Sequence, residues 1–331
     1  MKHVLIGGNG FVGRETVRLL SQGDEDEIVV VDLAESLKAH PKKQRPGLSY
    51  LSADVSKQGA LDSIHLGSDD VVHHLATKLI TPNQPRFGRE EFFRICAVDG
   101  TTEILAWMKR QNNKNLVFWS TDMVYGPALE TPRTENHPKH PFGPYGRSKV
   151  AAEKIVLSAV EAGDITCTIF RPRLILGAGR LGIFELLFRA LDRGWPIPLI
   201  GQGANKFQFV SVTDCACATL LAAQKGCPNG VYNLGTDNSP TSYDLMRNFL
   251  DRTGSKSRLI KTPGWLVKNI LRLLNIVKIA PMDPEQYEIA DLDVELDTTT
   301  VKRDLGWAPT QTDDELIFAA YSAYKKLHKA D

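Results

Sequence analysis

The sequence lacks long hydrophobic runs, a surplus of charge of either sign and an even set of cysteines. No uncharged segment approaches the roughly 20 residues that cross a bilayer, and the opening MKHVLIGGNG leads straight into glycines. We therefore expect neither a membrane span nor a signal peptide. The formal net charge is +1 over 331 residues, which gives nucleic acid no general attraction. These absences favour a cytoplasmic protein.

The five cysteines do not suggest a set of disulfides. Cys215 and Cys217 are two residues apart in DCACATLLAA, a segment with a helical pattern, and positions two apart on a helix face different directions. We expect reduced thiols, as in a cytosolic protein, and no metal site.

Short apolar runs alternate with amphipathic segments through the first half of the chain. The runs HVLIGG, EIVVVDL, DDVVHHLA, NLVFWST and ITCTIFRP are rich in strand-forming residues, and helical patterns such as GRETVRLLSQG lie between them. This order predicts an α/β fold, a Rossmann-like, doubly wound parallel sheet with helices on both faces.

After Pro172 the pattern changes, and the last hundred residues are mostly helical with Pro and Gly interruptions. We expect a dinucleotide-binding domain over residues 1–173, to which the chain returns with a strand and a helix at about 207–235. A smaller, mostly helical substrate-binding domain is expected over residues 174–206 and 236–331.

The heptapeptide GGNGFVG lies between the first predicted strand and a predicted helix. Its spacing, Gly7-x-x-Gly10-x-x-Gly13, lets backbone N–H groups approach a pyrophosphate, and the helix N-terminus adds a partial positive charge. Because of this strand-and-helix context, we interpret the motif as a dinucleotide cradle rather than an ordinary turn.

Two acids follow at the ends of later strands. Asp32 lies about 20 residues beyond the glycines, where a carboxylate binds the adenosine ribose hydroxyls. A carboxylate repels a 2′-phosphate, so Asp32 favours NAD over NADP, although Arg14 weakens this preference. Asp54, in SADVS, is placed to meet the adenine.

The segment YGRSK places Tyr145 and Lys149 four residues apart, on one face of a predicted helix. A nearby ammonium favours tyrosinate and lowers the pKa of a phenol from its usual value near 10. Tyr145 could then exchange a proton with a substrate hydroxyl near neutral pH. A solvated helix face is the alternative, and the upstream dinucleotide cradle disfavours it.

Together, GGNGFVG, HHLAT, STDMVYG, PFGPYGRSK, RPRLILGAG and DLGWAP resemble the extended short-chain dehydrogenase/reductase family over nearly the whole chain. The best-known members are nucleotide-sugar epimerases and dehydratases, and the sequence is closest in motif to sugar 4-epimerases. The resemblance implies that Tyr145, helped by Lys149, takes a proton from a sugar hydroxyl whose oxygen Thr121 holds. The carbon gives hydride to NAD, and an epimerase returns it to the other face of a transient keto sugar.

The motifs and the resemblance together predict a set of site residues. The expected catalytic residues are Thr121, Tyr145, Lys149 and Asp122. The expected cofactor contacts are Gly7, Gly10, Phe11, Val12, Gly13, Asp32, Asp54, Val55, Leu75, Ala76, Thr77, Tyr145, Lys149 and Pro172. The expected substrate contacts are Met123, Arg171, Arg173 and Lys206.

Several positions depart from the family pattern. The 4,6-dehydratases carry Thr-Asp-Glu where this chain has Thr121-Asp122-Met123, and a thioether cannot act as the base that eliminates water. Asp122 is then either catalytic or a structural carboxylate. Ala97 takes the place of a common Asn, and Phe207 takes the place of an arginine that binds the substrate diphosphate in many relatives.

The acids of IADLDVELDTTT offer no later arginine for that diphosphate. An anionic diphosphate needs cationic or N–H partners. Lys206, Arg173 or Arg180 must therefore hold it, or the substrate is not a soluble nucleotide sugar.

The segment PGWLVKNILRLLNIVKIAP, residues 263–281, is the most apolar in the chain, yet it carries Lys268, Arg272 and Lys278. It could pack on the substrate domain, contact a protein partner, or lie on a membrane with its bases toward the headgroups. A homodimer is expected, and peripheral membrane contact remains open.

The sequence thus predicts an NAD-dependent epimerase of the nucleotide-sugar, UDP-glucose 4-epimerase-like type. The alternative is an NAD(P)-dependent reductase or dehydrogenase of a keto-sugar, a lipid-linked sugar or a 3β-hydroxysteroid-like alcohol. A non-enzymatic relative is disfavoured, because Thr121, Tyr145 and Lys149 are all present.

Overall fold

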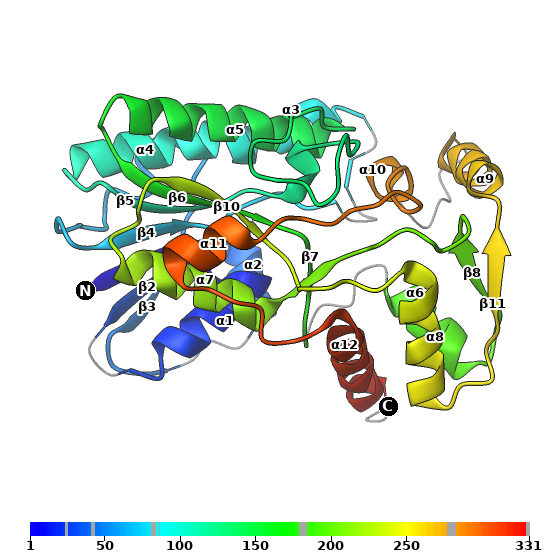
Figure 1. Cartoon of the computed structure of the whole chain (residues 1–331). Coiled ribbons are helices and arrows are strands. Elements are labelled where there is room, and N and C mark those ends of the chain that lie inside the picture. Colours follow the sequence, from blue (N-terminus) through cyan, green and yellow to red (C-terminus); the bar gives the residue numbers. More distant parts are fainter. Residues whose placement is uncertain are drawn as a thin grey trace.

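The computed structural model of the chain describes residues 1–23, 26–40, 44–80, 84–85, 87–178, 184–276 and 283–328. A parallel sheet with helices on both faces forms one side of the molecule, and a mostly helical region forms the other (Figure 1). The predicted Rossmann-like fold with a helical C-terminal region is therefore confirmed. No described helix is long and apolar enough to cross a membrane.

The main sheet has seven strands in the order β10-β6-β5-β4-β1-β2-β3. Every pairing in it is parallel. Its strands are β1 (Lys2–Ile6), β2 (Glu27–Asp32), β3 (Leu48–Ser52), β4 (Val71–His74), β5 (Asn115–Trp119), β6 (Thr166–Pro172) and β10 (Gly230–Leu234). The predicted apolar runs supply five of them, and their near-continuous burial explains why these runs do not alternate with polar residues.

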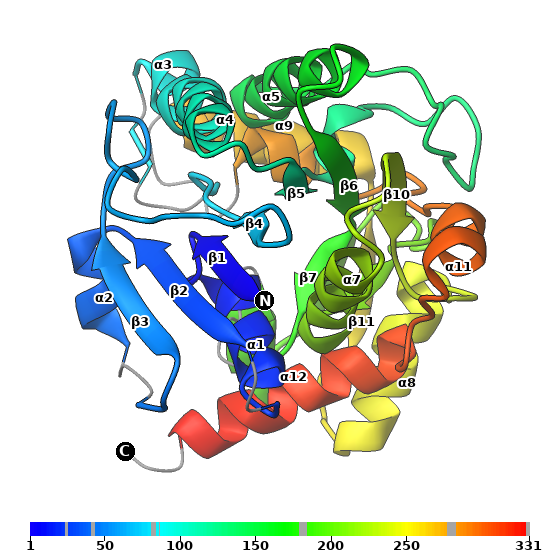
Figure 2. The same ribbon diagram turned by 90° about the vertical axis from the view of Figure 1, so that its left-hand side faces the viewer.

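Helices cover both faces of this sheet (Figures 1 and 2). One layer contains α1 (Phe11–Leu20), α2 (Ala34–Ala39) and α7 (Val212–Gln224). The other contains α3 (Arg89–Arg94), the π-helical turn η1 (Ile95–Asp99), α4 (Gly100–Arg110) and α5 (Pro144–Glu161). A 3₁₀ turn, η2 (Asp122–Val124), follows β5.

The chain crosses between the two halves more than once. Two short parallel sheets belong to the second half, formed by β7 (Leu174–Leu176) with β9 (Phe209–Ser211) and β8 (Ile197–Ile200) with β11 (Leu259–Thr262). Its helices are α6 (Phe184–Asp192), α8 (Ser242–Thr253), α9 (Gly264–Ile276), α10 (Pro284–Tyr287) and α12 (Asp313–His328), whereas α11 (Thr299–Leu305) packs on the large sheet. The chain returns to the large sheet through α7 and β10, and α11 lies beside them (Figure 1).

The strand order places a topological switch between β1 and β4. The chain proceeds outward from β1 to β2 and β3, and then crosses to β4 and the strands beyond it. In open parallel sheets, ligands bind at the carboxyl ends of strands at such a switch. Gly7 follows β1 at this edge, Thr77 comes shortly after β4, and Thr121 comes shortly after β5.

Candidate active site

A cavity of about 740 Å³ lies at this edge of the sheet and continues toward the second half of the molecule. Its walls include every residue predicted to bind the cofactor. They also include the four predicted catalytic residues and two of the predicted substrate contacts, Met123 and Arg173. The structure thus brings together residues from the ends of six strands, β1 to β6, and from α5, although they are up to about 165 positions apart in the sequence.

The glycine turn is shaped for close backbone approach. Gly7 has φ +78°, and a Cβ there would lie 2.5 Å from the backbone N of Ala76. A Cβ on Gly13 would lie 2.5 Å from the carbonyl oxygen of Gly8. Gly10 caps α1 without any side-chain hydrogen bond, so no side chain of the cap occupies the first N–H groups of this helix. Those groups remain directed at the cavity, which suits a pyrophosphate.

Asp32 fixes one end of this cradle. Its Oδ2 accepts a hydrogen bond from the backbone N–H of Asn9 at 3.0 Å, and its Oδ1 accepts one from that of Leu33 at 2.9 Å. At Asp54, burial raises the pKa of the carboxyl, but hydrogen bonds from Ser56 outweigh burial and leave the pKa below its usual value. Both carboxylates line the cavity at the ends of neighbouring strands.

The glycine cradle, the carboxylates and the cavity beyond them fit a bound dinucleotide. The cradle has no room for Cβ atoms at its two tightest glycines, and its helix N-terminus faces the cavity. Asp32, the carboxylate expected to bind the ribose, lies at the end of β2. The cavity then extends without a break to Tyr145 and Lys149 on α5.

The preference for NAD can be tested at Asp32. We expect Asp32→Ala to weaken NAD binding about tenfold to a hundredfold, because a ribose-bound carboxylate contributes roughly 1.5–3 kcal/mol. NADP binding should change little or improve, since the repulsion of its 2′-phosphate is removed. Calorimetric titration with each cofactor measures both effects, with Glu35→Ala on α2 as the control. Equal losses for both cofactors would contradict the assignment of Asp32 to the ribose.

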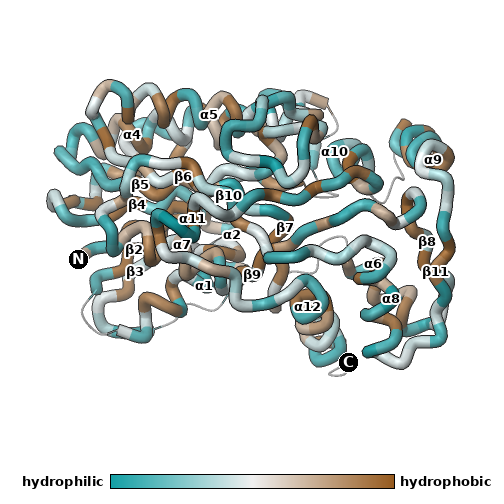
Figure 3. The backbone as a smooth tube through the Cα atoms, in the orientation of Figure 1, coloured by the Kyte–Doolittle hydropathy of each residue, from teal (hydrophilic) through white to brown (hydrophobic). Residues whose placement is uncertain are grey.

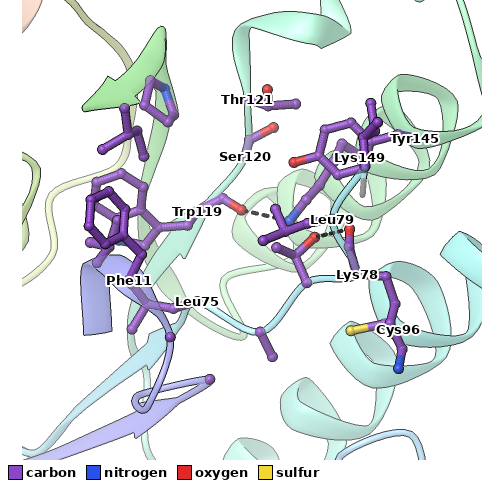
Figure 4. Close-up of a pocket in the computed structure, with 18 of the residues that line it drawn as sticks. Phe11, Leu75, Lys78, Leu79, Cys96, Trp119, Ser120, Thr121, Tyr145 and Lys149 are labelled. Carbon is purple, nitrogen blue, oxygen red and sulfur yellow. Dashed lines mark hydrogen bonds between the residues drawn. The ribbon is translucent and has the colours of Figure 1, made fainter. Parts of the chain in front are cut away.

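The hydroxyl of Tyr145 points toward the strand end that carries Ser120 and Thr121, with the side chain of Lys149 beneath the ring (Figure 4). All four predicted catalytic side chains, those of Thr121, Asp122, Tyr145 and Lys149, are buried. Lys149 donates a hydrogen bond from Nζ to the carbonyl oxygen of Trp119 at 2.9 Å. That bond fixes the ammonium at the end of β5, beside the tyrosine it is predicted to assist.

Burial lowers the pKa of Lys149 to about 8. The ammonium is therefore mostly charged at neutral pH and becomes neutral as the pH rises through 8. Its charge contributes to the potential that favours tyrosinate, and the low polarity around it strengthens that effect.

This lowered pKa has a consequence for stability. In the unfolded chain Lys149 titrates near 10.5, so folding with a charged Lys149 costs about 3 kcal/mol below pH 8, and this cost disappears as the pH rises to 10.5. The free energy of unfolding of the cofactor-free wild type, measured in urea, should therefore rise relative to that of Lys149→Met between pH 8 and 10. Lys154→Met, at an exposed position on the same helix, is the control. If the free energies of unfolding of wild type and Lys149→Met depended on pH in the same way, the lowered pKa of Lys149 would be contradicted.

The structure corrects the prediction for Arg171. Its guanidinium does not line the cavity but is buried below it, where Nε and NH2 donate to the two oxygens of Glu153 at 2.9 and 2.7 Å. The remaining nitrogen donates to the hydroxyl of Tyr125 and to the backbone oxygen of Glu135. With all three guanidinium nitrogens engaged, Arg171 supports the strand end from beneath rather than contacting substrate.

Glu153 was not predicted from the sequence, yet it connects several parts of the site. It also accepts a hydrogen bond from Ser120 Oγ at 2.5 Å and a salt bridge from Lys139 at 2.6 Å. Ser120 lines the cavity next to Thr121. The network therefore fixes the backbone from which the predicted catalytic hydroxyl projects. A Glu eight residues after Tyr145 on the same helix was the only sequence signal for it.

Asp122 and Arg173 form a buried ion pair at the cavity wall. Arg173 NH1 donates to Asp122 Oδ2 at 3.0 Å, and Thr121 Oγ1 donates to Asp122 Oδ1 at 3.3 Å. Burial lowers the pKa of Arg173, an effect that Asp122 opposes. The guanidinium lies 4.1 Å from the ring centre of Phe207, and its Nε and NH2 have no hydrogen-bond partner among the described residues. Arg173 therefore has donors left for an anionic or oxygen-rich group.

Lys206 and Arg180 were the other candidates for holding a diphosphate. Lys206 does not line the cavity, because its ammonium pairs with Glu295 at 3.3 Å and lies away from the cavity. Its neighbour Phe207 turns inward instead. Arg180 lies outside the described residues. Within the described part of the chain, the cations on the cavity wall are Lys78, Lys149 and Arg173.

A second feature missed from the sequence is the contact between α10 and the start of α5. The carboxylate of Glu285 accepts the backbone N–H groups of Tyr145 and Gly146 at 3.3 and 3.4 Å. Burial raises the pKa of Glu285, and those two hydrogen bonds oppose that rise. Gln286, Ile289 and Ala290 of the same segment line the cavity. The separation of 140 residues left no local signal for this cap.

A hydroxyl, a phenol and an ammonium around one end of a cavity that begins at a glycine cradle define a class of enzyme. Such enzymes move hydride between a nicotinamide and a substrate carbon. The chain belongs to the NAD dependent epimerase/dehydratase family, whose sequence model matches residues 3–235. This membership confirms the resemblance to extended short-chain dehydrogenases/reductases and the expectation of an enzyme that uses NAD.

Similar proteins of the family carry different activities. The chain is 25% identical to a dTDP-glucose 4,6-dehydratase of Streptomyces niveus, over 93% of this chain and 88% of that protein. It is 28% identical to a UDP-glucose 4-epimerase of Lactobacillus helveticus, over 77% and 82%. A solved UDP-glucose 4-epimerase of Thermotoga maritima, with UDP-glucose, superposes with a TM-score of 0.77 at 23% identity, over 99% of this chain and 100% of that chain. The fold is shared, and the reaction is decided by the residues of the site.

Proposed function

We propose that the protein is an NAD-dependent sugar epimerase of the nucleotide-sugar, UDP-glucose 4-epimerase-like type, working through a transient keto intermediate. The observation that carries the proposal is the cavity wall at residues 121–123. Thr121 lies there with Tyr145 and Lys149 nearby (Figure 4). Met123, two positions further along the chain, also lines the cavity, and its thioether cannot act as a base. The family's dehydratases place a glutamate at that position as an elimination base.

The chain's own groups account for the proton in the first step. Tyr145 removes the proton from the sugar hydroxyl, and the charge of Lys149 stabilises the phenolate that receives it. Thr121 holds the same oxygen as it becomes a carbonyl. Bound NAD supplies the hydride acceptor for the carbon and the donor for the reverse transfer.

Water elimination lacks a base on this wall within the described residues. Asp122, the remaining acid of the motif, is held by Arg173 and by Thr121, so its carboxylate positions these two groups. Met123 contributes an apolar surface. The two features together support epimerisation over dehydration.

A second candidate is a reductase or dehydrogenase of a keto-sugar, a lipid-linked sugar or a 3β-hydroxysteroid-like alcohol. It is favoured by the apolar cavity wall, to which Phe207, Phe184 and Ile289 contribute. The described part of that wall carries few cations, which also favours this second candidate, because a diphosphate needs charged partners when it is partly buried.

Cofactor retention separates the two candidates. An epimerase regenerates its cofactor in each turnover and can keep it bound, so the purified protein should release about one NAD per chain when denatured. A protein purified without cofactor that oxidises added NADPH in the presence of a ketone would contradict epimerisation. A thermal-shift screen with UDP-, GDP- and dTDP-sugars then identifies the nucleotide through the stabilisation that binding produces.

A further inference from the structure

Helix α9 turns its apolar side away from the protein. The fractional exposures of Trp265, Leu273 and Ile276 are 69%, 64% and 73%, and Leu266 and Ile270 are exposed as well. At 3.6 residues per turn these five side chains fall on one side of the helix, within an arc of about 140°. In α9 only Leu271 is fully buried. We call the side formed by the five exposed residues the α9 face.

The two bases of α9 hold the helix in this orientation, with Lys268 toward its buried side and Arg272 at the edge of the α9 face. Lys268 Nζ pairs with Asp291 at 2.5 Å and donates to the backbone oxygen of Glu288 at 2.9 Å. Arg272 donates from two nitrogens to Glu288 Oε1. Both bases fasten the helix to the protein through acids of residues 288–291, and the apolar side of the helix is left outward. Residues 277–281 of the segment lie outside the described residues.

The apolar surface continues beyond the helix at the same end of the molecule. Strand β11 leads into α9, and both lie at the end farthest from the N-terminus (Figure 1), where hydrophobic stretches of the backbone gather (Figure 3). Ile260 on β11 and Trp195, just before its partner strand β8, are exposed. Exposed tryptophans at the edge of an apolar surface are typical of contacts with a membrane interface.

The charge around this surface is mostly positive, and the acids that contact α9, Glu288 and Asp291, are paired with its bases. From Arg252 to Ile276 the sequence contains six bases and no acid. Two of the bases are the paired Lys268 and Arg272, and the nearby Lys256, Arg258 and Lys261 are exposed. Basic residues close to an anionic lipid surface contribute roughly 1 kcal/mol each.

This charge distribution distinguishes a bilayer from a second copy of the chain. A two-fold interface through the α9 face would bring two acid-free segments together, and like charges repel. An anionic bilayer instead meets both the apolar side chains and the surrounding bases.

The α9 face is coupled to the active site through one short segment. Glu288 and Asp291, which hold α9, flank Ile289 and Ala290, which line the cavity. We propose that the α9 face docks reversibly on anionic lipid bilayers, with Trp265, Leu273 and Ile276 inserted at the headgroup level and Lys256 and Arg258 facing the lipid phosphates. This inference goes beyond the proposed reaction and does not depend on it.

Co-sedimentation of the full chain with vesicles tests the proposal. Wild type should pellet with phosphatidylcholine vesicles that contain phosphatidylglycerol, and much less with pure phosphatidylcholine or at high salt. The double variant Leu273→Glu/Ile276→Glu should bind at least tenfold more weakly. Leu129→Glu, at a residue 75% exposed on the dinucleotide-binding half, should bind as wild type does. All three side chains are exposed, so unchanged melting curves are expected and serve as the check on folding.

Two results would overturn the proposal. One is equal vesicle binding by wild type and the double variant, or no binding by wild type. The other is a lipid-free wild-type dimer, seen by light scattering, that becomes a monomer in the double variant, because the α9 face would then be covered by a second copy. If the wild type released no NAD or turned over no sugar, the proposed reaction would be contradicted and the vesicle result would be unaffected.

Discussion

Replacing Tyr145 by Phe should lower the turnover number by a factor of at least about a thousand, while NAD affinity should change less than about threefold. General acid–base catalysis contributes 10²–10⁴ to a rate, and the hydroxyl is the group that exchanges the proton with the sugar. The aromatic ring remains in the variant, so its edge-to-face contact with Phe93, at 5.5 Å between centroids, is preserved.

The control for this variant is Tyr232→Phe. Tyr232 is equally a buried tyrosine, on β10, but it does not line the cavity. Its loss of a hydroxyl should leave turnover near the wild-type value. If Tyr145→Phe retained wild-type turnover with folded, NAD-loaded protein, Tyr145 would have no part in the chemistry.

Replacing Glu153 by Ala should lower the free energy of unfolding by about 3–5 kcal/mol, the cost of leaving one partner of a buried ion pair without the other. Glu153 and Arg171 are both fully buried and joined by two hydrogen bonds. Urea unfolding at pH 7 measures the effect, and Glu161→Ala, at an exposed position near the end of the same helix, should be nearly neutral. A loss below 1 kcal/mol would contradict the role of Glu153 as the centre of the network.

The same pair adds a pH dependence at acidic pH. Burial alone would raise the pKa of Glu153, but the hydrogen bonds from Arg171 outweigh it and leave the pKa lowered. The stabilisation is therefore complete above pH 4.5, the ordinary value, and is lost as the pH falls through the lowered pKa. Glu153→Met combined with Arg171→Met should recover much of the stability, because no unpaired buried charge remains.

The sequence allowed the large sheet and its cofactor edge to be predicted, because both depend on local patterns. The run HVLIGG followed by a glycine turn and an amphipathic helix encodes a strand, a cradle and a helix within about 20 residues. The cavity walls in the structure contain all the expected cofactor contacts, since these lie at strand ends or at the starts of α1 and α5, which the sequence patterns located.

The residues that the sequence misassigned depend on contacts between distant segments. Arg171 has the charge of a substrate ligand, but Glu153, Tyr125 and Glu135 surround it, and no local pattern showed that they would meet. Likewise, Glu285 caps the helix of Tyr145 across 140 positions. The outward side of α9 could not be predicted either, because an apolar stripe is the same in sequence whether it faces a core or solvent.

The most direct test of the proposed epimerase uses a nucleotide sugar labelled with deuterium at the carbon that is oxidised. With UDP-glucose labelled at C4, incubation with the purified protein and no added cofactor should give the C4 epimer with the deuterium retained, because the hydride leaves and returns within one active site. NMR of the products measures both inversion and retention. A keto product that accumulates only when NAD or NADP is added, or a 6-deoxy product formed by loss of water, would contradict epimerisation.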